Sequence, residues 1–364
     1  MNVNTQQLHA LGQSLWIDNI TRQMLDDGTL SRYIAELSIT GLTSNPTIFE
    51  HAIGNGSAYD DQIATLARAG HSGEDLFFQL ALRDLTRAAD LFRSTHGATD
   101  GVDGWVSLEV SPLIVDNAHK TTQAAARLHA AAGRPNLYIK IPGTKAGNMA
   151  IEDSIFAGVP INVTLLFSRE QYLASAVAYL RGIERRIAAG RAARVESVAS
   201  LFVSRWDVAV KDQLPPAQRN RLGIAIAHRT YVAYRELLAS PRWQRLAAAG
   251  AQPQRLLWAS TGTKDPDAPD TLYVEALAAP DTIDTIPEKT LQAFAEHGKG
   301  GSPMSLNGVD AESVITKLRA LGIDDGALAD RLQREGAEAF LKSWTSLLAG
   351  IAHKTSQLAG ATAR

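Results

Sequence analysis

Short apolar runs, many of them rich in β-branched residues, recur along the chain and are bounded by polar or turn-forming residues. Each run holds seven to nine residues, which is the length and pattern of a buried β-strand. The pattern therefore predicts eight strands. They are Ser14–Ile20, Ser38–Asn45, Trp105–Pro112, Asn136–Pro142, Val159–Phe167, Val198–Arg205, Arg255–Thr261 and Leu272–Ala278.

Segments with apolar residues at helical spacing lie between these strands. One of them follows Ser168, which is separated from Gln171 by the spacing of a capping box, and ends near Gly190. Another spans Gln218–Ser240. Strands that alternate with helices favour a parallel sheet with crossover helices. Eight such strands favour an α/β fold of the (β/α)8 TIM-barrel type, which takes about 250 residues.

Two stretches account for the length beyond a minimal barrel. Leu42–Gly104 is too long for one connection and predicts two or three helices, and Glu288–Arg364 continues with helical sequence after the last predicted strand. The glycine-rich segment His297–Gly308 predicts a loop between helices. We therefore expect residues 1–364 to form a single barrel domain, with extra helices after the second strand and at the C-terminus.

Lys140 stands near the end of a strongly apolar strand, on the face opposite Ile139 and Ile141. A lone strand lysine is commonly structural or partly exposed, but a barrel strand is buried on both faces and leaves no wet face for it. The same alternation places other polar side chains opposite aliphatic neighbours, and we expect all of them to converge at the carboxyl-terminal mouth of the barrel. They are Asp18, Glu109, Asn162 and Thr164, with Asn45 directly after the second strand.

A buried lysine suits carbonyl chemistry. Desolvation lowers the pKa of a buried amine, and a neutral lysine attacks a carbonyl carbon to give a Schiff base. Forming and using that Schiff base requires proton transfers, for which Asp18 and Glu109 are the candidate groups. These residues predict a metal-free aldolase. The side chains suited to hold a polyhydroxylated substrate are Asn45, Asn162 and Thr164.

Basic and small residues follow two late strands. Arg205 ends the sixth predicted strand, and Ser260, Gly262 and Lys264 lie at or just after the end of the seventh. Alone, Arg205 fits a surface ion pair equally well. Barrel phosphate sites, however, commonly use late-strand loops with basic side chains and backbone N–H groups, so the combination favours an anionic substrate.

Composition excludes several classes of protein. The net charge of −2 shows no basic excess of the kind that nucleic-acid binders carry, and no apolar run approaches the roughly 20 residues of a membrane span. The chain has no cysteine, and its N-terminus lacks the pattern of a signal peptide, so we expect a cytoplasmic protein. The nine histidines show no metal-ligand spacing, and there is no dinucleotide or P-loop glycine pattern, so we expect no metal and no cofactor.

Seven ordered stretches between Trp16 and Pro266 resemble transaldolase, a class I Schiff-base family of the pentose phosphate pathway, and the length of the chain resembles its longer prokaryotic form. An ordered set of seven is far more specific than any single stretch. The stretches read WIDNI, GLTSNPTIF, VSLEVSP, YIKIPGT, GVPINVTLLFS, VASLFVSRWD and LLWASTGTKDP.

This resemblance implies a role for each matching residue. Lys140 matches the Schiff-base lysine, and Asp18 matches the acid/base that takes the substrate hydroxyl proton as the carbon–carbon bond breaks. Glu109 matches a glutamate that works through a water during imine formation, and Thr164 helps to place that water. The remaining matches are Asn45, Asn162 and Ser200 for the dihydroxyacetone portion and Arg205 for the phosphate.

The loop after the seventh strand departs from the family pattern. Many transaldolases carry a second phosphate-binding arginine in a late loop, whereas this loop reads STGTK, with Ser260 at its start and Lys264 in the place where we expect the second cation. Lysine is a point charge and arginine a planar fork, so the two hold a phosphate differently.

The resemblance implies transfer of a dihydroxyacetone unit from sedoheptulose 7-phosphate or fructose 6-phosphate to glyceraldehyde 3-phosphate or erythrose 4-phosphate, in a ping-pong reaction without a cofactor. One alternative is an aldolase of similar fold, acting on fructose 6-phosphate, that releases free dihydroxyacetone; the relatives of that kind are much shorter. Another is a non-catalytic phosphosugar-binding barrel, which would need no buried nucleophile. A monomer and a homodimer both remain open.

Overall fold

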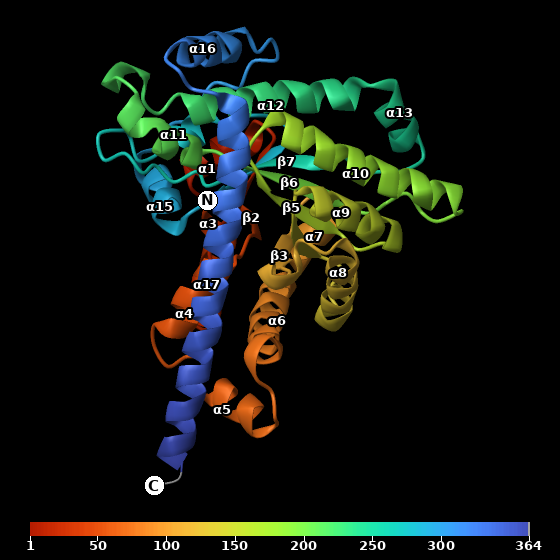
Figure 1. Cartoon of the computed structure of the whole chain (residues 1–364), viewed down its shortest axis with the longest axis vertical. Coiled ribbons are helices and arrows are strands. Elements are labelled where there is room, and N and C mark those ends of the chain that lie inside the picture. The colour runs from red at the N-terminus through yellow and green to blue at the C-terminus, as the bar shows by residue number, and fades with distance from the viewer. Residues whose placement is uncertain (363–364) are drawn as a thin grey trace.

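The chain folds into a closed barrel of eight parallel strands surrounded by helices (Figure 1). This computed structural model describes residues 1–362, and it confirms the predicted (β/α)8 TIM barrel. Each strand pairs with its successor in the sequence, and β8 closes the barrel on β1. The strands are β1 (Gln13–Ile17), β2 (Ile39–Leu42), β3 (Trp105–Glu109), β4 (Leu137–Pro142), β5 (Ile161–Leu166), β6 (Ser197–Phe202), β7 (Arg255–Ala259) and β8 (Thr282–Ile286).

The eighth strand was predicted wrongly. The segment Leu272–Ala278 contains the helix α14 (Leu272–Ala276), and the closing strand follows it. Tyr273, Val274, Leu277 and Ala278 are the buried apolar residues of this segment. Their i, i+1, i+4, i+5 spacing is that of one helix face, which a short apolar run does not distinguish from a strand.

The true closing strand, β8, was missed because it carries polar residues. Thr282, Asp284 and Thr285 give this strand the appearance of an exposed segment, yet all three side chains are buried. A polar residue buried in a strand gives no hydrophobic signal, so the periodicity that revealed the other strands was absent here.

Helices cover the outside of the barrel. The Ser168 cap is confirmed, since its Oγ accepts from the Gln171 N–H at 3.1 Å. The second bond of the capping box differs, because Gln171 Oε1 accepts from the N–H of Phe167 and not from that of Ser168. The helices outside the two long stretches are α1 (Val3–Ala10), α2 (Arg22–Asp26), α3 (Thr29–Glu36), α8 (Ala118–Ala132), α9 (Lys145–Ala157), α10 (Arg169–Ala188), α11 (Ser204–Val210), α12 (Leu222–Ala239), α13 (Pro241–Ala248) and α14, with 3-10 turns at Pro112–Ile114, Lys211–Gln213 and Pro216–Gln218.

The insertion after β2 holds four helices rather than two or three, because α6 and α7 are separate helices that meet at Phe92. The C-terminal stretch is helical as predicted, and His297–Gly308 forms a loop from Gly298 onward. The helices are α4 (Pro46–Gly54), α5 (Asp60–Arg68), α6 (Gly73–Leu91) and α7 (Arg93–Ala98) in the insertion, and α15 (Glu288–His297), α16 (Val309–Ala320) and α17 (Asp325–Thr362) after β8.

The last helix, α17, runs the length of the molecule and packs against the inserted helices α4, α5 and α6 (Figure 1). Its Trp344 is buried against Phe77 and Phe78, with ring centroids 4.8 Å and 5.7 Å apart. The two additions to the barrel therefore stabilise each other. No helix within residues 1–362 is long and apolar enough to cross a membrane.

Three aromatic side chains fill the lower, amino-terminal half of the barrel interior. Tyr138 stacks on Trp105 with ring centroids 4.0 Å apart and on Trp16 at 6.2 Å. A Cβ atom at Gly41 would overlap the Trp16 indole, so glycine at that position of β2 makes room for the ring. We call these three buried, stacked side chains (Trp16, Trp105 and Tyr138) the aromatic plug.

Candidate active site

Lys140 is buried in the upper half of the barrel, as the alternation predicts. Its ammonium nitrogen donates to the Ser44 carbonyl at 3.0 Å and lies 3.5 Å from Glu109 Oε2. The side chains of Lys140 and Glu109 are 6% and 7% exposed, so both groups are held away from bulk water. The strand register explains this meeting, because Glu109 on β3 and Asn162 on β5 both lie level with Lys140 on β4.

Burial shifts the pKa of Glu109 toward a value that suits proton transfer. Desolvation raises the pKa of its carboxyl to about 7, against the opposing effect of the Lys140 ammonium. Glu109 Oε2 is the oxygen that faces the Lys140 ammonium at 3.5 Å, and it accepts no hydrogen bond within residues 1–362. A carboxyl that titrates near neutral pH beside the reactive amine can both give and take a proton.

Asp18 follows β1 and is held by two threonines. Its Oδ1 accepts from Thr43 Oγ1 at 2.7 Å, and the hydroxyl groups of Thr43 and Thr285 lie 2.6 Å apart. Burial raises the pKa of Asp18, while the Lys140 ammonium and the Thr43 hydroxyl lower it. The carboxyl is therefore oriented by its neighbours and less acidic than an exposed aspartate.

A hydrogen-bond chain links three strands beside the lysine. Asn162 Nδ2 donates to Ser107 Oγ at 3.0 Å, and Ser200 Oγ donates to Asn162 Oδ1 at 2.7 Å. Thr164 Oγ1, in contrast, is buried with no partner among the described residues. A buried hydroxyl of this kind is costly to leave unpaired, so Thr164 is ready to bind a water or a substrate group.

A cavity of about 260 Å³ opens at the carboxyl-terminal ends of the strands, and we call it the mouth cavity. Glu109 and Asn162 do not line it but lie behind its wall, where they contact Lys140 and Ser200. The other eight predicted site residues do line it: Asp18, Asn45, Lys140, Thr164, Ser200, Arg205, Ser260 and Lys264.

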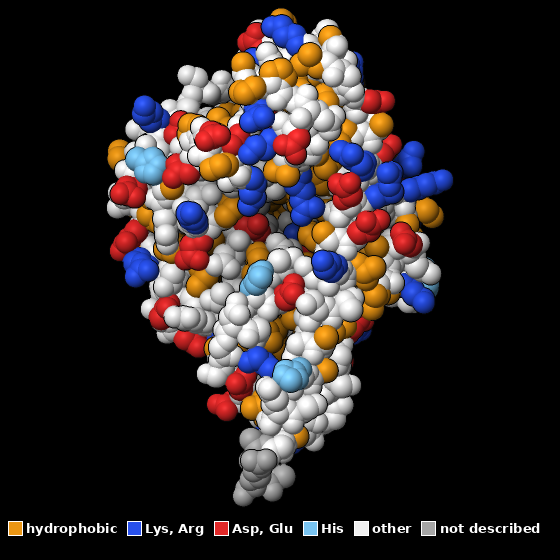
Figure 2. Space-filling view, turned by 60° about the vertical axis from the view of Figure 1, so that its left-hand side comes forward, with side chains coloured by type: hydrophobic (Ala, Val, Ile, Leu, Met, Phe, Trp, Pro, Cys, Tyr) orange, Lys and Arg blue, Asp and Glu red, His pale blue; other side chains and the backbone are white. Residues whose placement is uncertain are grey.

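The mouth cavity carries two cations without partners. Neither the Arg205 guanidinium nor the Lys264 ammonium forms a hydrogen bond or an ion pair to any residue in 1–362, and the Arg205 guanidinium lies over the Phe202 ring at 5.3 Å. Burial lowers the pKa of Arg205, with Glu335 acting in the opposite direction. Figure 2 shows Lys and Arg side chains (blue) around a hollow near the centre of one face. Unpaired cations that line one cavity are suited to an anionic ligand.

Two local details differ from the prediction for this region. β6 ends at Phe202, so Arg205 lies in the first turn of α11 rather than at the end of the strand. Ser260 has a left-handed backbone, with φ of 58°, and its hydroxyl lies 2.9 Å from that of Ser204. Strained backbone of this kind clusters at functional sites.

The sequence interpretation missed several residues that border the cavity. Thr43 stands inside the stretch GLTSNPTIF, two residues before Asn45, and that position was the available signal. Thr285 was lost with the missed eighth strand. Phe340 lines the cavity from α17, and His51 from α4. Phe340 carried no local signal, since only the path of α17 brings it to the mouth.

Metal ligands do not gather anywhere in the described chain: within residues 1–362 there is no group of three or more His, Cys, Asp or Glu side chains that could hold a metal ion. The reactive groups of the mouth are an amine, two carboxyls and several hydroxyls. A closed (β/α)8 barrel with a buried lysine between carboxyl groups, at a cavity lined with cations, has the features of a Schiff-base aldolase.

Comparisons with known proteins agree with this class. The family model Transaldolase/Fructose-6-phosphate aldolase matches residues 15–351, and the chain belongs to this family. A transaldolase of Renibacterium salmoninarum is 42% identical over 357 residues, which cover 96% of each chain. Transaldolases of Acidothermus cellulolyticus (44% identical, 95% of each chain) and Neisseria gonorrhoeae (40%, 94% of this chain and 97% of the relative) are also similar.

Proposed function

We propose that this protein is a transaldolase that carries a dihydroxyacetone unit from a ketose phosphate to an aldose phosphate as a Schiff base on Lys140. The family match and relatives named transaldolase at 40–44% identity support the transferase activity, and they do not favour a free aldolase or a binding barrel. The observation that carries the residue assignment is the Lys140 ammonium, held 3.0 Å from the Ser44 carbonyl and 3.5 Å from Glu109 at a cavity with two unpaired cations.

Imine formation is the first step. The Lys140 ammonium passes a proton to the Glu109 carboxylate 3.5 Å away, the free amine adds to the ketose carbonyl carbon, and the resulting carbinolamine loses its hydroxyl as water. That loss requires a proton, which Glu109 supplies from behind the wall because its pKa of about 7 leaves part of the population protonated at neutral pH. Glu109 does not line the cavity, so we infer a relaying water that the unpartnered Thr164 hydroxyl holds.

Carbon–carbon cleavage follows. Asp18 takes the proton of the hydroxyl on the carbon beyond the breaking bond, a carbonyl forms there, and the bonding electrons move into the imine to give an enamine on Lys140. The aldose phosphate then leaves. An acceptor aldehyde reverses the sequence: the enamine carbon attacks it, Asp18 returns the proton, and hydrolysis frees the lysine.

The phosphate group is assigned to Arg205 and Lys264. Both cations line the mouth cavity without a protein partner, and so does Ser260, whose hydroxyl lies 2.9 Å from that of Ser204, the residue before Arg205. Lys264 stands in for the second arginine that the family resemblance leads us to expect. Asn45 and Ser200 line the same cavity and are assigned to the dihydroxyacetone portion, with Asn162 orienting Ser200 through its 2.7 Å hydrogen bond.

We also infer that the described residues act as one domain, because α17 contacts the inserted helices and contributes Phe340 to the mouth cavity. We further propose that α17 covers the mouth cavity. The cytoplasmic location is a prediction from the sequence, and so is the assembly, a monomer or a homodimer.

The test is to trap the intermediate. The protein is mixed with fructose 6-phosphate, reduced with borohydride and digested, and the modified peptide is mapped by mass spectrometry. We expect a three-carbon adduct on Lys140, which Lys140→Arg abolishes and which Lys145→Arg, a change at the exposed lysine five residues on, leaves in place. A folded protein without any lysine adduct would refute the mechanism. Adding erythrose 4-phosphate before reduction should discharge the adduct, which separates transfer from simple cleavage.

A further inference from the structure

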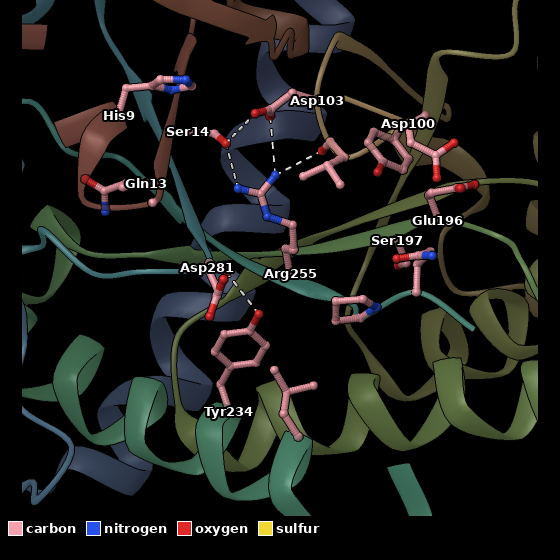
Figure 3. Close-up of a pocket in the computed structure, with 17 residues that line it drawn as sticks. His9, Gln13, Ser14, Asp100, Asp103, Glu196, Ser197, Tyr234, Arg255 and Asp281 are labelled. Atoms are coloured by element: carbon pink, nitrogen blue, oxygen red, sulfur yellow. Dashed lines mark hydrogen bonds and ion pairs between the residues drawn. The ribbon is translucent and has the colours of Figure 1, made fainter. Parts of the chain in front are cut away.

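The two ends of the barrel satisfy their polar groups in different ways. A cavity of about 450 Å³ at the amino-terminal end is lined by four carboxylates, and each of them forms an ion pair with Arg194, Arg235 or Arg255. Arg255, at the start of β7, also donates to Ser14 Oγ on β1 at 2.6 Å and to the Thr282 carbonyl on β8 at 2.9 Å (Figure 3). Side chains of the strands therefore join this end of the barrel. At the carboxyl-terminal end, which carries the mouth cavity, a side chain of α17 has that role.

Gln333 of α17 joins the carboxyl-terminal ends of two neighbouring strands. Its side-chain amide nitrogen donates to the Gly143 carbonyl at 3.2 Å and to the Leu165 carbonyl at 3.0 Å. Gly143 directly follows β4, the strand of Lys140. Leu165 lies in β5, directly after Thr164. One amide group thus connects the strand of the proposed nucleophile with the strand of the hydroxyl that is proposed to hold the relaying water.

The backbone that Gln333 binds departs from regular strand geometry. Leu165 has a left-handed backbone, with φ of 57°, and the pairing of β5 with β6 shifts its register between Val163 and Leu166. We call this irregularity the β5 bulge. Left-handed backbone is strained for a residue other than glycine and persists only where the surrounding structure holds it. Gln333 supplies part of that support, because its hydrogen bond ends on the Leu165 carbonyl.

The β5 bulge fixes the position of Thr164. This residue is fully buried, lines the mouth cavity, and has a hydroxyl without a partner among the described residues. The Gly143 N–H donates to the Thr164 carbonyl at 2.8 Å, and Gln333 binds the carbonyls of both Gly143 and Leu165. Because these three hydrogen bonds link Thr164 to its neighbours along β5 and across to β4, a shift of the Leu165 backbone would move the Thr164 hydroxyl.

The next turn of α17 packs on the same bulge. A Cβ atom at Gly336 would lie 2.9 Å from Leu165 Cδ2 and 3.4 Å from a guanidinium nitrogen of Arg205, so the helix approaches the bulge with no room for a side chain. Phe340, one turn further on, lines the mouth cavity. Gln333, Gly336 and Phe340 follow the i, i+3, i+7 spacing of one helix face. That face of α17 therefore rests on the strand ends that carry the site.

We propose that Gln333 is a positioning residue for imine formation: it holds the β5 bulge so that the Thr164 hydroxyl keeps the relaying water between Glu109 and the carbinolamine. The inference rests on the proposed function, from which it takes the roles of Glu109 and Thr164. Gln333 does not line the mouth cavity, so it acts through the backbone and not on the substrate. A displaced proton relay slows the step that it serves, while the groups that bind the substrate stay in place.

The test compares steady-state kinetics of the full-length parent and of Gln333→Met, with fructose 6-phosphate as donor and erythrose 4-phosphate as acceptor. Methionine resembles glutamine in length but cannot donate a hydrogen bond. We expect kcat to fall about tenfold and KM to stay within about twofold, and the borohydride-trapped adduct on Lys140 should form more slowly by the same factor as kcat. Arg334→Met, at the exposed neighbouring position, is the matched control and should keep the parent's kcat. If the methionine variant does not fold, Gln333→Asn, whose amide is one methylene shorter, should give the same pattern.

A double variant separates positioning from a general structural effect. Thr164→Val removes the hydroxyl itself, so adding Gln333→Met to it should lower kcat by less than about twofold if Gln333 acts through that hydroxyl. Effects that multiply, a Gln333→Met variant as fast as the parent, or a rise in KM with kcat unchanged would each overturn the inference and leave the proposed function standing. A folded parent protein that forms no lysine adduct would overturn the proposed function, and this inference with it.

Discussion

Replacing Asp284 by asparagine should stabilise the protein at alkaline pH and leave it nearly unchanged in acid. Asp284 lies on β8 with 0% exposure, and neither carboxyl oxygen accepts a hydrogen bond within residues 1–362. Burial therefore raises the pKa of this carboxyl to about 7 from an ordinary value of 3.8.

The direction in which stability changes with pH follows from how tightly the folded and unfolded states bind the Asp284 proton. Because the folded state holds the proton more tightly than the unfolded state, stability falls as pH rises from about 3.8 to about 7 and is constant above that range. At about 1.4 kcal/mol per pKa unit, the full loss is on the order of 4 kcal/mol. An uncharged amide of the same shape avoids this loss but resembles the protonated carboxyl, so Asp284→Asn should gain several kcal/mol at pH 8 and little at pH 4.

The assay is urea denaturation followed by tryptophan fluorescence at several values between about pH 4 and pH 8. The quantity compared is the difference in unfolding free energy between variant and parent at each pH. Asp310→Asn, at an exposed position, is the matched control and should stay within about 0.5 kcal/mol of the parent throughout. If Asp284→Asn destabilises the protein equally at both ends of the range, the carboxylate is satisfied in the folded state and the reasoning is refuted.

Three further predictions concern the mouth cavity and its support. Thr43→Val removes the 2.7 Å hydrogen bond to Asp18 and should lower kcat about tenfold with KM little changed, as steady-state kinetics would show; an unchanged kcat would mean that Asp18 needs no such support. Arg205→Met should raise KM for the phosphorylated donor by about 10- to 100-fold while leaving borohydride trapping of unphosphorylated dihydroxyacetone intact, and equal loss with both substrates would contradict a phosphate role. Trp344→Ala should cost about 3–5 kcal/mol in urea denaturation, because this side chain is 1% exposed between α17 and α6, whereas the exposed Leu341→Ala should cost under about 1 kcal/mol.

The sequence revealed most of the barrel because seven of its strands show a clear apolar signal, and strand alternation then assigned Lys140 to the interior correctly. Alternation could not show which interior residues reach the cavity. Glu109 and Asn162 have the orientation of Lys140, yet they lie behind the wall because neighbouring side chains cover them. Such covering depends on packing between strands that lie far apart in the sequence.

The features that the sequence did not reveal depend on buried polar residues and on packing between segments far apart in the chain. β8 was missed because Asp284 and its threonine neighbours carry no hydrophobic signal, although the closed barrel buries them completely. Phe340 reaches the mouth only because α17 packs along the inserted helices, and nothing within α17 itself indicates that contact. The residues that a local pattern can identify are therefore those whose position is decided by their own strand.

The aromatic plug has a consequence for the order of events in catalysis. Tyr138 stacks on Trp16 and Trp105 in the buried interior of the barrel, and Lys140 lines the mouth cavity, so we infer that substrates reach the lysine through the mouth. The departing aldose and the incoming one must use the same opening in turn. The first product of the forward reaction should therefore compete directly with the acceptor for the loaded enzyme, and accumulated product should slow turnover by returning to the enamine that it has just left.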